Sequence, residues 1–317
     1  MTTELDSTTG SSAARAAADE AGRTAARREI VLFLVLTAVL TVASTLAARA
    51  AGADIRHPDQ APPAGQLALF STAFWPAVAA LVTRKVVGGR VLRSGWGFRR
   101  ASLRSLRTAW ALPVGGAVVG YAAVWLSGLG ELRPDGAASA VGLGSHPALG
   151  ATLAAVLGLT AGVLPWALLA IGEEVGWRGL LVPRLAEVTT FGRTALLSGL
   201  AWSLFHLPVL LFVPGAVLTN LPVAFGCMLV AELAMAWPMA ALTLRTGSIW
   251  PAVVLHGAVN AGLYMFGDPL TGDNGSTEYW AGETGVLTTL GLVAVITAWW
   301  LVRGRHDRRA PGAGRRQ

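Results

Sequence analysis

Two adjacent carboxylates interrupt an apolar stretch of this chain, and an arginine follows about one helical turn later. Glu173 and Glu174 lie in the stretch ALLAIGEEVGWRGLLV, which also contains Arg178. Neighbouring residues point about 100° apart around a helix, so the two carboxylates must face different directions. Glu174 and Arg178 are four residues apart with the acid first, which is the favourable arrangement for an ion pair. We therefore expect Arg178 to hold Glu174 and to leave Glu173 available for chemistry.

Two histidines and an asparagine are further polar side chains in apolar stretches that could take part in a reaction. His256 and Asn260 are four residues apart, so both can reach one point from the same helix. Pro208 removes a backbone donor and should bend the helix beside His206. A carboxylate, two imidazoles and a carboxamide in a cavity shielded from lipid can activate water. The carboxylate would take a proton from the water, neutral imidazoles would hold the water or a divalent metal, and the amide would stabilise an oxyanion.

Each of these features also has a purely structural explanation when it is taken alone. A Glu/Arg pair at a helix end can be a solvated ion pair, and a membrane histidine can be an interhelical hydrogen-bond partner. Glu232 has no partner at motif spacing, so we interpret it as a lumen-facing or paired residue whose role stays open. Trp177, Trp202 and Trp250 are interpreted as packing or interface anchors. The presence of candidates on three predicted spans at compatible depths is what favours chemistry.

The composition indicates a membrane protein that carries these groups on helices. Of the 317 residues, 53% are apolar and 14% are charged, whereas about a quarter of the residues of soluble domains are charged. Runs of about 20 apolar residues predict helices, because lipid cannot satisfy backbone hydrogen-bonding groups. Eight such runs lie near residues 30–48, 66–83, 108–128, 149–171, 194–213, 221–244, 248–266 and 284–302. The expected fold class is all-α, a polytopic membrane protein with about eight transmembrane helices.

Basic residues gather on one side of this layout. Twenty-two of the 25 Lys and Arg residues fall in the two tails and in alternate loops, above all in residues 84–107. The opposite loop 267–283 contains four acids and no base. By the positive-inside rule, both termini are expected to be cytoplasmic in a multi-pass protein of the cell membrane. The lipid bilayer is then the expected partner, and the basic charge indicates no nucleic acid.

The predicted domain organisation is a single membrane domain with two tails. Residues 1–28 lack an apolar period and are expected to be a disordered cytoplasmic tail. Residues 29–303 form one transmembrane helical domain, with the chemically promising motifs at about 150–265, and residues 304–317 form a basic cytoplasmic tail. The first span ends like a signal-peptidase site, but its leader is long, so we expect a retained anchor. The single cysteine, Cys227, excludes a disulfide framework and a thiolate metal site.

Three motifs in this region resemble those of a known family. The stretch EEVGWRG resembles the Glu-Glu-x-x-x-Arg motif of the CPBP intramembrane proteases, which include CAAX prenyl endopeptidases and bacteriocin-associated Abi proteins. WSLFH resembles the second motif, Phe-x-x-x-His, with Trp202 in place of the usual Phe, and HGAVN resembles the third, His-x-x-x-Asn/Asp. All three occur in the order of the family. His-Glu-x-x-His, Gly-x-Ser-Gly and Gly-x-Gly-Asp, which mark other membrane proteases, do not occur in the sequence.

The resemblance implies a site for a membrane endopeptidase of the CAAX-protease type. Its residues would be Glu173, Glu174, Arg178, His206, His256 and Asn260. Glu173 would activate water with His206 beside it, and Glu174 with Arg178 would support the site. His256 and Asn260 would stabilise the oxyanion or help to bind a metal. A Zn²⁺ ion held by Glu173, His206 and His256 and a metal-free glutamate mechanism both stay open.

The expected substrate is a membrane peptide or protein that is cleaved near the cytoplasmic face. The Ala/Gly/Arg-rich composition with one lysine, Lys85, indicates a GC-rich bacterial genome, so a bacteriocin precursor or a regulatory protein is a candidate substrate. Two other functions stay open. One is a non-catalytic membrane binding or bacteriocin-immunity protein. The other is a proton-coupled transporter that uses Glu232 and the histidines, although the lack of clear internal repeats disfavours it.

Overall fold

The computed structural model describes residues 5–57, 60–88 and 95–309, and within these ranges it describes side chains from residue 17 to residue 302. Helices make up nearly all of the regular structure in this part of the chain. The exceptions are β1 (Glu131–Leu132) and β2 (Thr271–Gly272), which form a short antiparallel pair. The chain is therefore an all-α polytopic membrane protein, as the sequence predicted.

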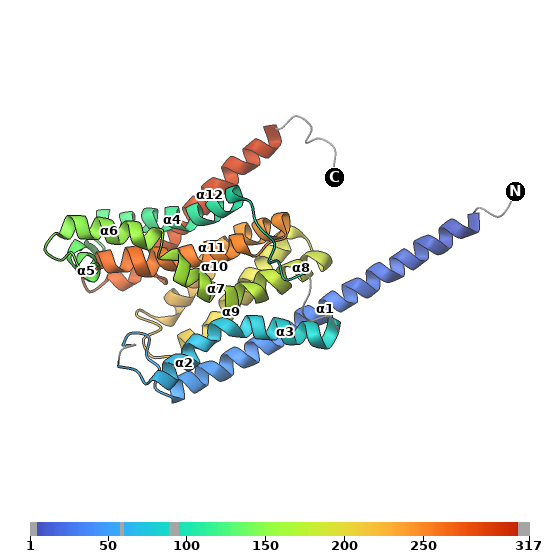
Figure 1. Ribbon diagram of the computed structural model, residues 1–317, viewed down its shortest axis with the longest axis horizontal. Helices are drawn as coiled ribbons and strands as arrows, with labels where there is room; N and C mark the ends of the chain where they lie inside the picture. The colour runs from blue at the N-terminus through green and yellow to red at the C-terminus, as the bar shows by residue number, and fades with distance from the viewer. Residues whose placement is uncertain (1–4, 58–59, 89–94, 310–317) are drawn as a thin grey trace.

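The helices follow one another through short connections and pack lengthwise into a bundle (Figure 1). In chain order the α-helices are α1 (Leu5–Ala50), α2 (Pro63–Ser71), α3 (Trp75–Gly88), α4 (Leu103–Leu126), α5 (Pro134–Ala140), α6 (Pro147–Leu159), α7 (Val163–Gly176), α8 (Val182–Val188), α9 (Phe191–Phe212), α10 (Leu221–Thr246), α11 (Trp250–Ala261) and α12 (Val286–Arg309). The π-helical segments are η2 (Trp177–Leu181) and η3 (Gly262–Gly267). The 3₁₀ segments are η1 (Thr72–Phe74), η4 (Asp268–Leu270) and η5 (Thr277–Tyr279).

Six described helical segments are long and apolar enough to cross a membrane. They are Ala17–Ala50, Pro63–Val87, Leu103–Leu126, Pro147–Val188, Phe191–Phe212 and Leu221–Thr246. The last two of the eight predicted spans fall on shorter helices, namely α11 with η3 and the apolar part of α12, Val286–Val302. The chain is a multi-pass membrane protein, while the count of eight spans and the cytoplasmic position of both termini stay predictions.

Two stretches differ from the predicted layout, and a third lies outside the described residues. Residues 5–28 form the first part of α1 rather than the expected disordered tail. Their many Ala residues and four Arg residues have high helix propensity, and they continue directly into the apolar part of the same helix. The predicted span 149–171 is divided into α6 and α7 around Thr160. Residues 310–317 of the predicted basic tail lie outside the described residues.

The helices that carry the candidate site residues approach one another closely through small residues. On α11, a Cβ added to Gly257 would lie 2.6 Å from the backbone nitrogen of Ala167 on α7. On α9, a Cβ added to Gly199 would lie 3.0 Å from the Cβ of Ala236 on α10. This close packing agrees with the small-residue spacing of the sequence and brings polar side chains of α7, α9, α10 and α11 together.

Candidate active site

The second glutamate of the motif lies in a fully buried polar cluster. Arg178 Nη1 donates a hydrogen bond of 2.9 Å to Glu174 Oε1, and the two side chains are 1% and 0% exposed. His256 Nδ1 on α11 lies 3.0 Å from the same oxygen. The predicted Glu174–Arg178 pair is therefore confirmed. The structure adds that the same carboxylate orients His256, which the helical spacing did not indicate.

The first glutamate faces another direction and is held by neutral donors. Trp202 Nε1 on α9 donates a hydrogen bond of 2.8 Å to Glu173 Oε2. Trp177 Nε1 lies 3.4 Å from the same oxygen. Glu173 is buried, and Arg178 does not bind it. An indole orients a carboxylate without neutralising its charge, so Glu173 remains able to accept a proton.

The motif lies where α7 changes into a π-helical turn. α7 ends at Gly176, and η2 continues the helix from Trp177 to Leu181. π-Helical turns inside helices occur frequently at functional sites. The turn places Arg178 and Trp177 on either side of the two carboxylates, so each carboxylate has a bonding partner from the next turn.

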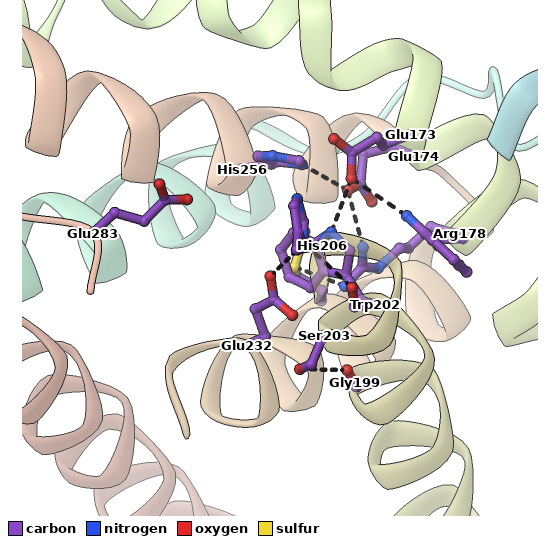
Figure 2. A network of polar contacts seen from close by, with 12 residues as sticks. Glu173, Glu174, Arg178, Gly199, Trp202, Ser203, His206, Glu232, His256 and Glu283 are labelled. Atoms are coloured by element: carbon purple, nitrogen blue, oxygen red, sulfur yellow. Dashed lines mark hydrogen bonds and ion pairs between the residues drawn. The ribbon is translucent and has the colours of Figure 1, made fainter. Parts of the chain in front are cut away.

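His206 has an acidic partner on the neighbouring helix. Its Nδ1 lies 2.8 Å from Glu232 Oε1 of α10 and 3.2 Å from the carbonyl oxygen of Trp202. Glu232 is buried, with 6% of its side chain exposed. A proton on Nδ1 that is held by Glu232 leaves Nε2 with the lone pair, as in a histidine that acts as a base or acceptor. Figure 2 shows the carboxylate of Glu232 turned toward the His206 ring.

Trp202 lies at the centre of this network. Its ring centroid is 5.1 Å from that of His256 and 6.1 Å from that of His206. The guanidinium carbon of Arg178 lies 4.6 Å from the indole centroid, which is a cation–π distance. The sequence analysis interpreted Trp177 and Trp202 as packing or interface anchors. Both are buried, but their indole nitrogens face Glu173, so they also orient the candidate base.

One cavity of about 190 Å³ brings four of the predicted residues together. Glu173, His206, His256 and Asn260 all line it, as does Glu232. Glu174 and Arg178 lie behind this wall and contact it through His256 and Trp202. The predicted set therefore divides into residues that reach the cavity and residues that hold them.

The described side chains are not arranged as a metal site. Within residues 17–302, the described part contains no group of three His, Cys, Asp or Glu side chains placed to hold a metal ion. Nδ1 of His256 and of His206 faces a glutamate, and Glu173 faces two indoles. Because Nε2 of both imidazoles stays free among the described residues, the zinc set of Glu173, His206 and His256 remains a prediction from the sequence, and we route no step of the mechanism through a metal.

Glu283 and Tyr264 are cavity residues that the sequence analysis did not identify. Both line the same cavity as Glu173. Glu283 lies in the acidic loop before α12, outside the three motifs, and Tyr264 lies one turn beyond Asn260. For Glu232, the signal was its charge inside an apolar stretch. For Glu283, no signal in the sequence separates it from the other acids of its loop.

Part of the chain matches a known protein family. Residues 155–262 match the family described as type II CAAX prenyl endopeptidase Rce1-like. Over these residues, about a third of the chain, the protein is similar to the CAAX protease family. The matched region runs from α6 to η3 and contains all six predicted site residues. No curated protein matches the sequence. In general terms, the chain is a CAAX-type intramembrane protease, and a membrane protease of this kind acts on membrane-associated substrates.

Proposed function

We propose that this CAAX protease hydrolyses a peptide bond of a membrane peptide or protein near the cytoplasmic face, with Glu173 as the base that activates water. The observation that supports this proposal is the cavity that Glu173, His206, His256 and Asn260 line together from three helices. Buried carboxylates and imidazoles are costly in a membrane and usually mark a functional site. Their convergence on one cavity agrees with the motif match.

The proposed reaction needs only groups of the chain and water. Glu173 accepts a proton from a water molecule, and the hydroxide attacks the carbonyl carbon of the scissile bond. The carbonyl oxygen gains the negative charge, and donors on the cavity wall, the amide of Asn260 or an imidazole, stabilise it. The proton on Glu173 then passes to the leaving nitrogen as the C–N bond breaks. The products are a carboxylic acid and an amine, which ionise to a carboxylate and an ammonium group by transfer of one proton, and Glu173 is ionised again.

The remaining site residues orient this machinery. Glu174 holds Nδ1 of His256 and is itself held by Arg178. Glu232 holds Nδ1 of His206 in the same way. Each imidazole is thus fixed by a carboxylate on one ring nitrogen and presents the other nitrogen for the reaction, a pattern that is common in catalytic histidines.

The proposal is tested by comparing the purified wild type with Glu173→Gln on vesicles made from the host membrane. New peptide termini, identified by mass spectrometry, should form only with the wild type, because the amide cannot accept the proton of water. His206→Ala should also lose cleavage while its thermal unfolding remains cooperative, which separates catalysis from a binding or immunity role. Identical termini with wild type and folded Glu173→Gln would exclude the proposed mechanism.

A chelator arm of the same assay addresses the metal. Zn²⁺ as a cofactor remains a proposal from the sequence, and the reaction above is written without a metal because the described residues contain no group of three His, Cys, Asp or Glu side chains placed to hold one. We expect cleavage to survive a zinc chelator and purified protein to contain far less than one zinc per chain. Loss of cleavage with the chelator and recovery with added Zn²⁺ would overturn this expectation.

A further inference from the structure

The active-site cavity contains a carboxylate that the proposed hydrolysis does not use. Glu283 lies in the loop before α12 and lines the cavity together with Glu173 and His206. Figure 2 shows its carboxylate turned toward the catalytic groups. None of the described residues that line this cavity is a lysine or an arginine. The cavity wall therefore carries negative charge without a permanent cation of the protein facing it.

An aromatic pair lies beside this carboxylate. The hydroxyl of Tyr264 donates a hydrogen bond of 2.6 Å to Glu283 Oε2. The ring centroids of Tyr264 and Trp166 are 5.0 Å apart, and both residues line the cavity. A carboxylate next to aromatic faces is a favourable environment for an ammonium or guanidinium group, because both the charge and the ring quadrupole attract a cation.

The loop that carries Glu283 is fixed by its own hydrogen bonds. Gly282 has a φ of 82°, a left-handed conformation that other residues rarely adopt. The hydroxyl of Thr288 on α12 donates a hydrogen bond of 2.6 Å to the carbonyl oxygen of Gly282. The amide of Gly285 donates to the same carbonyl group. The backbone that carries the carboxylate is thus held in place before a ligand arrives, which reduces the entropy that binding would cost.

A second carboxylate on the cavity wall has unused acceptor capacity. Glu232 binds His206 through Oε1, while its buried Oε2 has no hydrogen-bond partner among the described residues. Buried polar atoms are normally satisfied, so an unpartnered oxygen beside a cavity indicates a missing donor. A lysine has three N–H donors and an arginine has five, enough to bind acceptors on this wall.

A second cavity leads to the same carboxylate from the acidic loop. It measures about 280 Å³ and shares Tyr264, Gly282 and Glu283 with the active-site cavity. It is also lined by Asp268 and by further acids of the loop. Desolvation raises the pKa of Asp268 to about 6 against the opposing hydrogen bond from Tyr121, and repulsion by Glu283 adds to the rise. This region has an excess of negative charge, and its field would draw a cation toward Glu283.

We propose that Glu283, with Tyr264 and Trp166, forms a subsite that binds a lysine or arginine side chain of the substrate beside the scissile bond. This inference rests on the proposed function, because it places the subsite in the same cavity as the hydrolysed bond. A neutral side chain would leave the carboxylate without its counter-charge, and an acidic one would be repelled. The subsite therefore selects membrane substrates that carry a basic residue near the cleavage position.

Binding to an inactive variant tests the subsite without requiring cleavage. The probes are two fluorescent apolar peptides that differ only in one lysine or norleucine, and the protein is Glu173→Gln in an uncharged detergent without amine headgroups. We expect the lysine peptide to bind about tenfold more tightly, which is about 1.4 kcal/mol, because a hydrogen bond between charged groups is stronger than a neutral contact. Adding Glu283→Gln should remove this preference. Adding Glu283→Lys should reverse it toward a peptide with glutamate at that position.

A matched control and a cleavage arm complete the experiment. Glu131→Gln, in an exposed residue that is paired with Arg133, should keep the preference for lysine. In the cleavage arm, the wild type is given a peptide library, and the cleavage sites should be enriched in lysine or arginine near the cut.

Equal binding of the lysine and norleucine peptides, or an unchanged preference in Glu283→Gln, would overturn the subsite. A lysine preference in binding together with no Glu173-dependent cleavage would instead reject the proposed function and retain the subsite as a cation-binding site.

Discussion

The three glutamates closest to the reaction differ in the partners that hold them. Glu174 bonds to Arg178 and His256, Glu232 bonds to His206, and Glu173 accepts its hydrogen bonds from the neutral indoles of Trp202 and Trp177. Partners that carry positive charge stabilise the ionised carboxylate and reduce its ability to take a proton. The indoles donate hydrogen bonds without carrying charge, and this difference supports the proposal that Glu173 is the base.

Trp202→Phe should lower the rate of cleavage without abolishing it. The substitution keeps an aromatic ring and removes the donor that lies 2.8 Å from Glu173 Oε2. We expect kcat to fall by about tenfold, within the range of one hydrogen bond to a charged group. Trp177→Phe is the comparison, because its indole nitrogen lies 3.4 Å from the same oxygen and should matter less. Equal rates for wild type and Trp202→Phe would show that the indole only fills space.

Glu232→Gln should reduce kcat more than KM. The amide can still occupy the site, but it binds Nδ1 of His206 without a negative charge and does not specify the ring tautomer. We expect a loss of about tenfold or more in kcat, together with a changed pH–rate profile. Glu232→Asp, which keeps the charge, should recover part of the rate. Steady-state cleavage of one peptide by each variant measures these effects.

The matched control for Glu232→Gln is Glu29→Gln. Glu29 is also buried, and its partner is Arg184, 2.8 Å away between α1 and α8. This change removes a charge of the same kind from another part of the bundle, so it should affect thermal stability and leave the pH–rate profile unchanged. If both variants lose only stability, Glu232 has a structural role and does not orient His206.

Contacts within one helix could be predicted from the sequence, and contacts between helices could not. The spacing of Glu174 and Arg178 fixes their relative position on a helix, so their ion pair was predictable. The pairs Glu232–His206 and Trp202–Glu173 join different helices. Their formation depends on how far each helix is shifted and rotated against its neighbour, which residue spacing alone does not specify.

The close contact between α7 and α11 sets the distance between the two halves of the site. α7 carries Glu173 and Glu174, and α11 carries His256 and Asn260. Gly257, next to His256, lets the backbones approach because a Cβ there would lie 2.6 Å from the backbone nitrogen of Ala167. Backbone atoms cannot move aside as a flexible side chain can, so a larger residue must separate the helices.

Gly257→Ala should therefore destabilise the protein and misplace His256. Overpacking in a tight interface costs about 1–3 kcal/mol. Gly226→Ala on α10 is a suitable control, because an added Cβ there meets no atom within 4 Å and alanine favours the helix. Thermal unfolding in detergent should show a lower midpoint for Gly257→Ala and an equal or higher one for Gly226→Ala. A Gly257→Ala protein with unchanged stability and activity would contradict this account of the interface.

The ends of the elements followed the hydrophobic pattern less closely than their helical type and their order did. Every predicted span lies on helix, but one apolar run is divided near Thr160, where apolar residues continue through the break. In the other direction, residues 5–28 have no apolar period and are helical nevertheless. Hydrophobicity reports which residues can face lipid, whereas helix boundaries also depend on local backbone preferences that it does not record.

At the scale of the whole molecule, charge distinguishes the two ends of the bundle. The first part of α1 and the end of α12 project from one end, and α5 with the adjoining loops lies at the other (Figure 1). The β1–β2 pair ties the acidic loop 267–283 to the α5 end. Residues of this acidic loop line the proposed cation subsite. The subsite therefore lies opposite the end where the basic residues gather. A substrate that spans the cavity would then place its basic side chain toward the acidic end.

Cysteine labelling in intact cells tests the predicted orientation. Cys227 is the only cysteine, so Cys227→Ser provides a background without reactive thiols. Asp273→Cys would report on the acidic end and Arg100→Cys on the basic end, since both positions are exposed.

The positive-inside rule places the basic end in the cytoplasm. A membrane-impermeant maleimide should therefore label Asp273→Cys in intact cells and label Arg100→Cys only after permeabilisation. The reverse pattern would place both termini outside the cytoplasm and would contradict the predicted orientation.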